Sequence, residues 1–228
     1  MEIVAPTAAA DAAASRGTAG WRIAHRHPWL VLDFGAARAV LGWPVVGPHD
    51  GQARRVAWLQ VKNADLPLHR DPGAYFRARA AADGIEAELG LLTAADLGRF
   101  AEAQEGVAHA VATAGLGNAE SVVPSLVAGA SCAAHVGTIN IVASLDMALA
   151  PGARLEALSI AAEARTAAVL AHGRALADGR PATGTGTDCI VLASVREGRL
   201  ETHAGLHTPH GRMLGAVVYR AVAAALRP

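Results

Sequence analysis

TINIVASL (residues 138–145) and TDCIVLASV (residues 187–195) are two short apolar segments, separated by an Ala- and Leu-rich stretch that begins at Pro151. Short apolar segments bounded by turn residues are typical of buried strands, whereas the stretch over residues 151–177 has the period of a helix. Pro151 suits a first helical turn, because its missing amide hydrogen leaves no bond unmade there. The sequence therefore predicts a β-α-β unit over residues 138–195.

The flanking sequence extends this unit into one larger domain. The first sixty residues have the pattern of β-hairpins, with a turn at residues 47–51. Further strands are expected at residues 30–33, 55–61, 107–114 and 200–204, and further helices at residues 72–82, 94–104 and 209–226. We therefore predict an α+β or α/β fold, a single domain over residues 21–228 with a mixed β-sheet flanked by helices, preceded by a flexible Ala-rich tail over residues 1–20.

The composition restricts the classes of partner. Lys plus Arg and Asp plus Glu each total 20, so no charge excess favours nucleic acid or an anionic membrane surface. The sequence has no apolar run of about 18 residues, so we expect no membrane span. Cys132 and Cys189 form no C-x-x-C pair, which is compatible with a reduced, cytoplasmic location. An apolar face on the last helix would support a homo-oligomer, but a core-facing helix explains the same pattern.

Three turns rich in Gly, Thr and Asn lie next to expected strands. Glycine lets a backbone approach a ligand closely, and small polar side chains can orient it. Taken singly, such segments are ordinary tight turns; on neighbouring strands they would form one polar rim. None completes a phosphate-binding lysine motif or a G-x-G-x-x-G fingerprint. The segments are ATAGLGNA (112–119), GTINI (137–141) and ATGTGTD (182–188).

Ionisable side chains near the expected helices are the candidates for acid-base chemistry. Glu163 lies among alanines, and poorly hydrated surroundings would raise the pKa of its carboxyl; alternatively it lies on a solvated helix face. His207 precedes the last helix and could carry a proton near neutral pH. His203, His207 and His210 have spacings that can bind zinc, but no expected helix spans all three. The sequence has no G-x-S-x-G elbow, and self-cleavage before Thr138 or Thr185 is a further alternative.

In order and spacing, these motifs resemble those of the adenosylcobinamide amidohydrolase family. The resemblance rests on ATAGLGNA (112–119), GTINIV (137–142), EARTAAVL (163–170), ATGTGTD (182–188) and AGLHT (204–208). It implies hydrolysis of the amide that joins a propionyl arm of the corrin ring to aminopropanol, which gives adenosylcobyric acid; an adenosylated cobamide is a possible second substrate. The cobalt would enter with the corrinoid, so we expect neither a cofactor nor a metal held by the protein itself.

On this resemblance we assign roles as hypotheses. Glu163 or Asp188 would activate water, and His207 would protonate the leaving nitrogen. The amides of residues 184–186 would hold the oxyanion. Contacts to the substrate are assigned to Asn118, Thr138, Asn140, Gly184, Thr185, Gly186 and Thr187. The alternative is a corrinoid carrier or sensor without catalysis.

Overall fold

The predicted β-α-β unit is present in the computed structural model, which describes residues 14–16, 21–67, 69–125 and 137–227. It consists of β9 (Ile139–Leu149), α2 (Pro151–His172) and β11 (Cys189–Val195). The two strands pair in parallel, in a register that begins with Cys189 opposite Asn140. Helix α2 ends where Gly173 adopts a φ of 78°, a conformation that glycine adopts at little cost.

Most of the remaining strands join β9 and β11 in one mixed sheet. The remaining strands and α-helices are β1 (Ala14–Arg16), β2 (Arg22–Arg26), β3 (Trp29–Gly42), β4 (Asp50–Gln60), α1 (Pro72–Asp83), β5 (Leu89–Thr93), β6 (Ala101–Glu105), β7 (Ala108–Ala114), β8 (Ala119–Glu120), β10 (Gly184–Thr185), β12 (Leu200–Glu201) and α3 (Pro209–Ala225). Along the sheet the order is β1-β2-β3-β11-β9-β7-β6, with β4 paired to β3 and β5, and β12 paired to β9. Strands β8 and β10 form a separate antiparallel pair. The predicted fold class, α+β with a mixed sheet and flanking helices, is confirmed.

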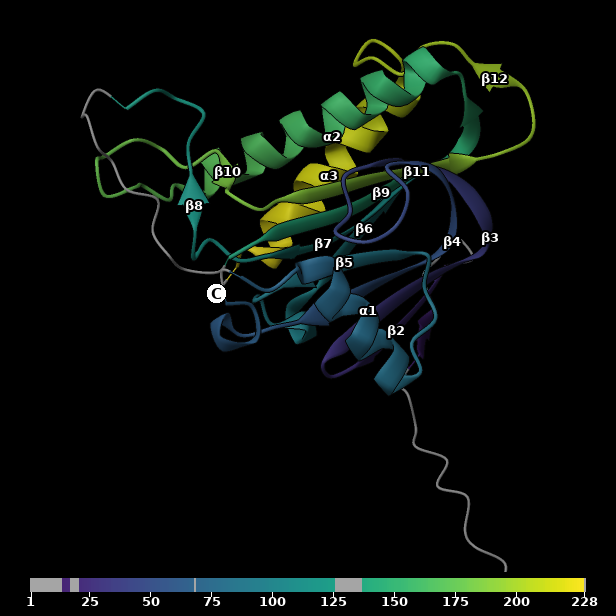
Figure 1. The fold of residues 1–228 in the computed structure, drawn as a ribbon. Coiled ribbons are helices and arrows are strands. Elements are labelled where there is room, and N and C mark those ends of the chain that lie inside the picture. Colours follow the sequence, from purple (N-terminus) through teal and green to yellow (C-terminus); the bar gives the residue numbers. More distant parts are fainter. Residues whose placement is uncertain (1–13, 17–20, 68, 126–136, 228) are drawn as a thin grey trace, which may run out of the picture.

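The long strand β3 folds the sheet into two layers. Its first half pairs with β2 and β4, and its last residues pair with β4 and β11. Its register with β4 shifts between Asp33 and Arg38, which marks the bend. Helices α2 and α3 cover one face of β6, β7, β9 and β11, while β2 to β5 and α1 lie on the other side (Figure 1).

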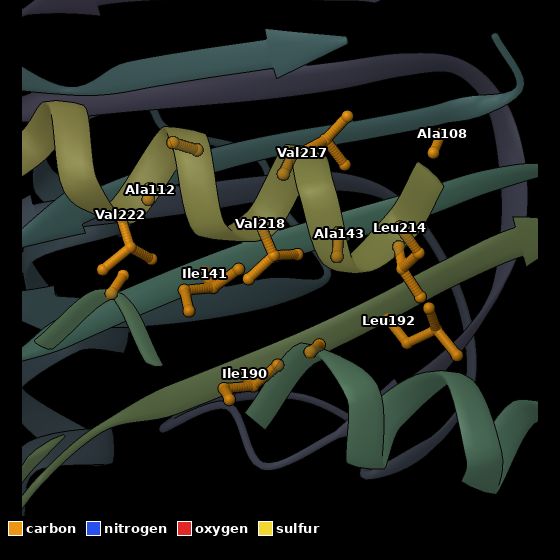
Figure 2. Close-up of a cluster of buried hydrophobic side chains, with 14 of the residues drawn as sticks. Ala108, Ala112, Ile141, Ala143, Ile190, Leu192, Leu214, Val217, Val218 and Val222 are labelled. Atoms are coloured by element: carbon orange, nitrogen blue, oxygen red, sulfur yellow. The ribbon is translucent and has the colours of Figure 1, made fainter. Parts of the chain in front are cut away.

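Alternation along the strands separates the two interiors. Ile141 and Ala143 of β9 pack toward the helices, and Val142 packs into the space between the sheet layers. Figure 2 shows Ile141 and Ala143 beneath Leu214 and Val218 of α3. The alanines of β7 on this face are fully buried, and their small side chains let α3 lie close to the sheet.

Two expectations differ from the structure. The helix expected at residues 94–104 is wrong: residues 97–99 form a 3-10 turn, and Ala101–Glu105 form β6. Gly106, with a φ of 53°, closes a tight hairpin between β6 and β7, so strand pairing overrides the helix propensity of Ala and Glu. The segment expected to be a flexible tail contains β1, which pairs with β2; the rest of residues 1–20 lies outside the described residues.

No helix in the part of the chain that the structure describes is long and apolar enough to cross a bilayer.

Candidate functional site

The three Gly-rich segments meet at one end of the sheet, where β7 ends and β9 and β11 begin. The amide of Gly115 donates to the carbonyl of Thr138 at 3.1 Å, and the amide of Gly186 donates to the carbonyl of Asn118 at 3.4 Å. Gly137 lies so close to the backbone of Gly117 that a Cβ there would overlap it. The prediction that these segments converge is confirmed, and residues 115–118, 137–140 and 184–188 are called the polar rim below.

Asp188 is the centre of the polar rim. One carboxylate oxygen accepts from the amide of Ile139 at 3.0 Å and from the hydroxyl of Thr185. The other accepts from the amide of Thr185 at 3.1 Å and forms an ion pair with Arg165 of α2. Only 7% of the Asp188 side chain is exposed. With so many donors around it, this carboxylate holds two loops and a helix together.

Arg165 closes this cluster from the helix side. Its side chain is 16% exposed, and burial lowers the pKa of its guanidinium below the ordinary value. Gly184 leaves room for the ion pair, because a Cβ there would lie 2.5 Å from an Arg165 nitrogen and 2.7 Å from an Asp188 oxygen. A larger residue at position 184 would therefore displace the pair.

The solvent-facing part of the polar rim carries hydroxyl and amide groups. Thr187 is exposed, and its hydroxyl donates to the carbonyl of Gly137 at 3.1 Å and lies 2.8 Å from the hydroxyl of Thr138. The side-chain amide of partly exposed Asn118 donates to Thr187 at 3.3 Å. Gly186 is also exposed, whereas Thr138 is buried beneath Thr187. Of the predicted substrate contacts, Asn118, Thr185, Gly186 and Thr187 can therefore be reached from solvent.

Asn140 has a different environment from the one its predicted role requires. It is fully buried between the sheet layers, and its side-chain nitrogen donates to the carbonyl of Leu92 at 2.8 Å. Its side-chain oxygen and the hydroxyl of Thr113, the residue opposite it on β7, have no partner in the structure. Asn140 thus connects β9 to β5, and in this conformation a ligand does not reach it.

Glu163 is exposed, so of the two alternatives considered for it the structure shows the solvated helix face and not the poorly hydrated surroundings. Positions two apart on a helix differ by roughly 200° around its axis. Since Arg165 faces the polar rim, Glu163 faces away from it. The two arginines of α2 pair with other residues: Arg165 with Asp188, and Arg154 with Asp50.

His207 lies near the opposite end of the sheet from the polar rim. It is exposed in the segment between β12 and α3, and β12 pairs with Ala148 and Leu149 at the far end of β9. The eleven residues of β9 span roughly 33 Å. Figure 1 likewise places β10 and β12 at opposite ends of α2. The structure therefore does not bring His207 and Asp188 together.

The neighbouring histidines make local contacts. A ring nitrogen of His210 lies 2.8 Å from the carbonyl oxygen of His203, and His203 lies 3.9 Å from the carboxylate of Glu156. Among the described residues, no group of three or more His, Cys, Asp or Glu side chains is placed to hold a metal ion.

Two of the three amides assigned to the oxyanion are already engaged. The amide of Thr185 donates to Asp188, and that of Gly186 donates to Asn118. Binding an oxyanion at these two positions would require the loop to change its internal hydrogen bonds.

Neither Arg165 nor Trp43 was among the site residues predicted from the sequence. The indole nitrogen of Trp43 donates to the carbonyl of Asp188 at 2.7 Å, and 39% of the residue is exposed. The available signals were an arginine inside an alanine run, and a tryptophan directly after an expected strand.

A comparison with models of known protein families gives a match. The model of the family described as adenosylcobinamide amidohydrolase matches residues 14–228, which include the whole polar rim. None of the curated proteins matches the chain.

Proposed function

The chain belongs to the adenosylcobinamide amidohydrolase family, and on this premise we propose that it hydrolyses adenosylcobinamide in cobamide salvage. Water adds to the carbonyl carbon of the amide between the propionyl arm of the corrin ring and aminopropanol. The C–N bond breaks, the carboxylate stays on the ring as adenosylcobyric acid, and the nitrogen leaves with aminopropanol after gaining a proton. The observation that carries the proposal is the family match over residues 14–228.

The reaction proposed needs no metal or cofactor bound by the protein itself. The cobalt enters with the corrinoid, and an adenosylated cobamide is a second substrate to test. Stoichiometric zinc in active protein, measured by elemental analysis, would contradict this part of the proposal.

The polar rim is the proposed substrate site. A corrin ring is fringed with carboxamides, which both donate and accept hydrogen bonds. Thr187 is exposed and Asn118 is partly exposed, and the Asn118 side-chain amide donates to the Thr187 hydroxyl; a substrate carboxamide would take the place of one partner in this bond. Gly186 between the neighbouring threonines lets the ring approach the backbone closely.

Within this site, Asp188 acts as a positioning residue. A general base needs a free lone pair for the proton of water, and the Asp188 oxygens already face the donors of Ile139, Thr185 and Arg165. Glu163 as the water-activating base and His207 as the proton donor stay predictions. The structure does not support them, because neither side chain faces the polar rim.

A corrinoid carrier or sensor is the second candidate function. The saturated hydrogen bonding of Asp188 favours it, since a binding protein needs rigid loops but no free base.

The purified protein incubated with adenosylcobinamide distinguishes the two functions. We expect aminopropanol and adenosylcobyric acid in equal amounts, measured by mass spectrometry, and heat-denatured protein as the control should release neither. Tight corrinoid binding without aminopropanol release would establish the carrier. Absence of both binding and release would refute the family-based proposal for this chain.

A further inference from the structure

One tryptophan of the chain differs from the others in its exposure. Of the four tryptophans, Trp21, Trp29 and Trp58 are at most 2% exposed and belong to the cores. Trp43 is 39% exposed. Burying an indole removes a large apolar area from water, so an exposed indole is a surface that a ligand can cover with a gain in free energy.

Trp43 is also held in place. Its amide donates to the carbonyl of Ile190 at 3.1 Å, and its indole nitrogen donates to the carbonyl of Asp188 at 2.7 Å. Gly42 before it lies against the backbone of Ile190, where a Cβ would overlap. Because both bonds go to the start of β11, the ring stays at the edge of the polar rim, and its ordering is complete before a ligand arrives.

The strand order sets what lies beside this ring. The strands β3, β11, β9 and β7 are consecutive neighbours in the sheet. Trp43 follows β3, Thr187 precedes β11 and bonds to residues before β9, and Asn118 follows β7. The exposed indole, the hydroxyl and the side-chain amide thus form a row across one end of the sheet, apolar at one side and polar at the other. A large flat ligand with an amide fringe fits this order of groups.

We propose that Trp43 is a substrate-binding residue whose indole packs against a flat conjugated part of the corrinoid, with the carboxamide fringe lying over Thr187 and Asn118 at the polar end of the row. The inference rests on the proposed function and adds a contact to it. The flat group is the corrin ring or the adenine of the upper ligand, and both present the same chemistry to an indole face. Since Trp43 acts in binding, its loss raises KM and leaves kcat nearly unchanged.

Calorimetric titration of two Trp43 variants tests the contact. With adenosylcobinamide, we expect Trp43→Ala to raise Kd about tenfold, and Trp43→Phe to raise it about twofold, because phenylalanine keeps a ring but loses the indole N–H. Leu155→Ala is the control, since Leu155 is an exposed apolar residue near the start of α2 and is 62% exposed. Cobinamide without the adenosyl group separates the two contacts: an equal loss with both corrinoids assigns the corrin ring, and a loss confined to the adenosyl form assigns adenine.

Two results would overturn the inference. One is wild-type affinity in Trp43→Ala. The other is an equal loss in Trp43→Phe and Trp43→Ala, because the N–H bond to Asp188, and not the ring face, would then explain the effect. Urea denaturation of each variant checks that the fold is retained, and we expect unfolding free energies close to that of the wild type.

Oxidative footprinting reads the same contact in the unmodified protein. We expect oxidation of Trp43 in the free protein, protection by the corrinoid, and equal labelling of Leu155 in both states. A protein that binds the corrinoid and releases aminopropanol with Trp43 unprotected refutes this inference alone. A protein that neither binds nor hydrolyses corrinoids refutes the proposed function.

Discussion

Asp188 and Arg165 form an ion pair that joins the start of β11 to the second half of α2, with only 7% and 16% of their side chains exposed. Both side chains are largely shielded from water, so each charge is stabilised mainly by its partner and not by hydration. Removing one partner leaves an uncompensated charge in the protein, which is costlier than losing the attraction itself.

We expect Asp188→Asn to lower the free energy of unfolding by about 3 kcal/mol, as for other buried pairs broken on one side. Hydrolysis of adenosylcobinamide should fall with it, because the polar rim loses its centre. Glu105→Gln is the matched control: Glu105 pairs with Arg220 at the surface, with half-exposed side chains, and its loss should cost less than 1 kcal/mol. Urea denaturation measures the unfolding free energy of both variants. Equal losses would show that the buried pair contributes no more to stability than the surface pair.

The space at Gly184 gives a second prediction. Gly184→Ala adds a methyl group 2.5 Å from an Arg165 nitrogen, so the ion pair must separate or the loop must shift. Overpacking of this kind costs about 1–3 kcal/mol. Gly152→Ala on α2 meets no atom within 4 Å and should change the melting temperature little. If Gly184→Ala has the melting temperature and the hydrolysis rate of the wild type, the close packing at Gly184 is not required for the ion pair or for activity.

Asn140 and Thr187 should separate stability from binding. Asn140→Ala leaves the buried carbonyl of Leu92 without its donor, at a cost of about 1–3 kcal/mol in unfolding free energy. Thr187→Ala removes a hydroxyl that donates to Gly137 and accepts from Asn118 at the exposed rim, so it should cost about 1 kcal/mol in unfolding free energy and also raise KM. Denaturation and steady-state kinetics on both variants check this, and the reverse pattern would mean that Asn140 contacts the substrate.

His109 predicts a dependence of stability on pH. It is 3% exposed and stacks on Trp21 with ring centroids 3.9 Å apart, and burial lowers its pKa below 6.5 despite a Glu102 oxygen at 3.6 Å. Asp146 also opposes this shift, whereas Arg38 adds to it. As the pH falls below about 6.5, the unfolded chain takes up the proton first, so the unfolding free energy decreases until the lowered pKa is reached.

His109→Gln removes this titration. Urea denaturation between pH 5 and 8 should therefore show a smaller decrease on acidification for the variant than for the wild type. A difference between the two proteins that is constant across this range would contradict the assignment to His109.

The sequence predicted the centre of the fold because its signals are local. Short continuous apolar segments, the helical period between them and Pro151 are sufficient to identify β9, α2 and β11. The prediction of a helix at residues 94–104 was wrong, because pairing with β7 overrides the helix propensity of the Ala and Glu residues in β6. Strand β5 was missed, because its parallel pairing with β4 joins residues far apart in the sequence, whereas β2 forms a local hairpin with β3 inside the region predicted to contain hairpins.

The candidate site also has a part that was predicted from the sequence and a part that was not. The convergence of the Gly-rich segments follows from the strand order, and it was predicted. The orientation of Glu163 depends on which face of α2 packs on the sheet, and that face is set by distant residues such as Asp188. The position of His207 depends on the path of the chain after β12, for which helical and strand periods give no information.

The polar rim lies where the parallel strands β9 and β11 begin, and α2 runs back toward it, so the rim is closer to the end of α2 than to its start. The aligned peptide dipoles of a helix place partial negative charge at that end, which would repel an anion forming during amide cleavage. Arg165 places a positive charge near this end of the helix, but Asp188 compensates that charge within the ion pair. The direction of α2 thus means that its backbone does not supply the positive potential that a developing oxyanion needs.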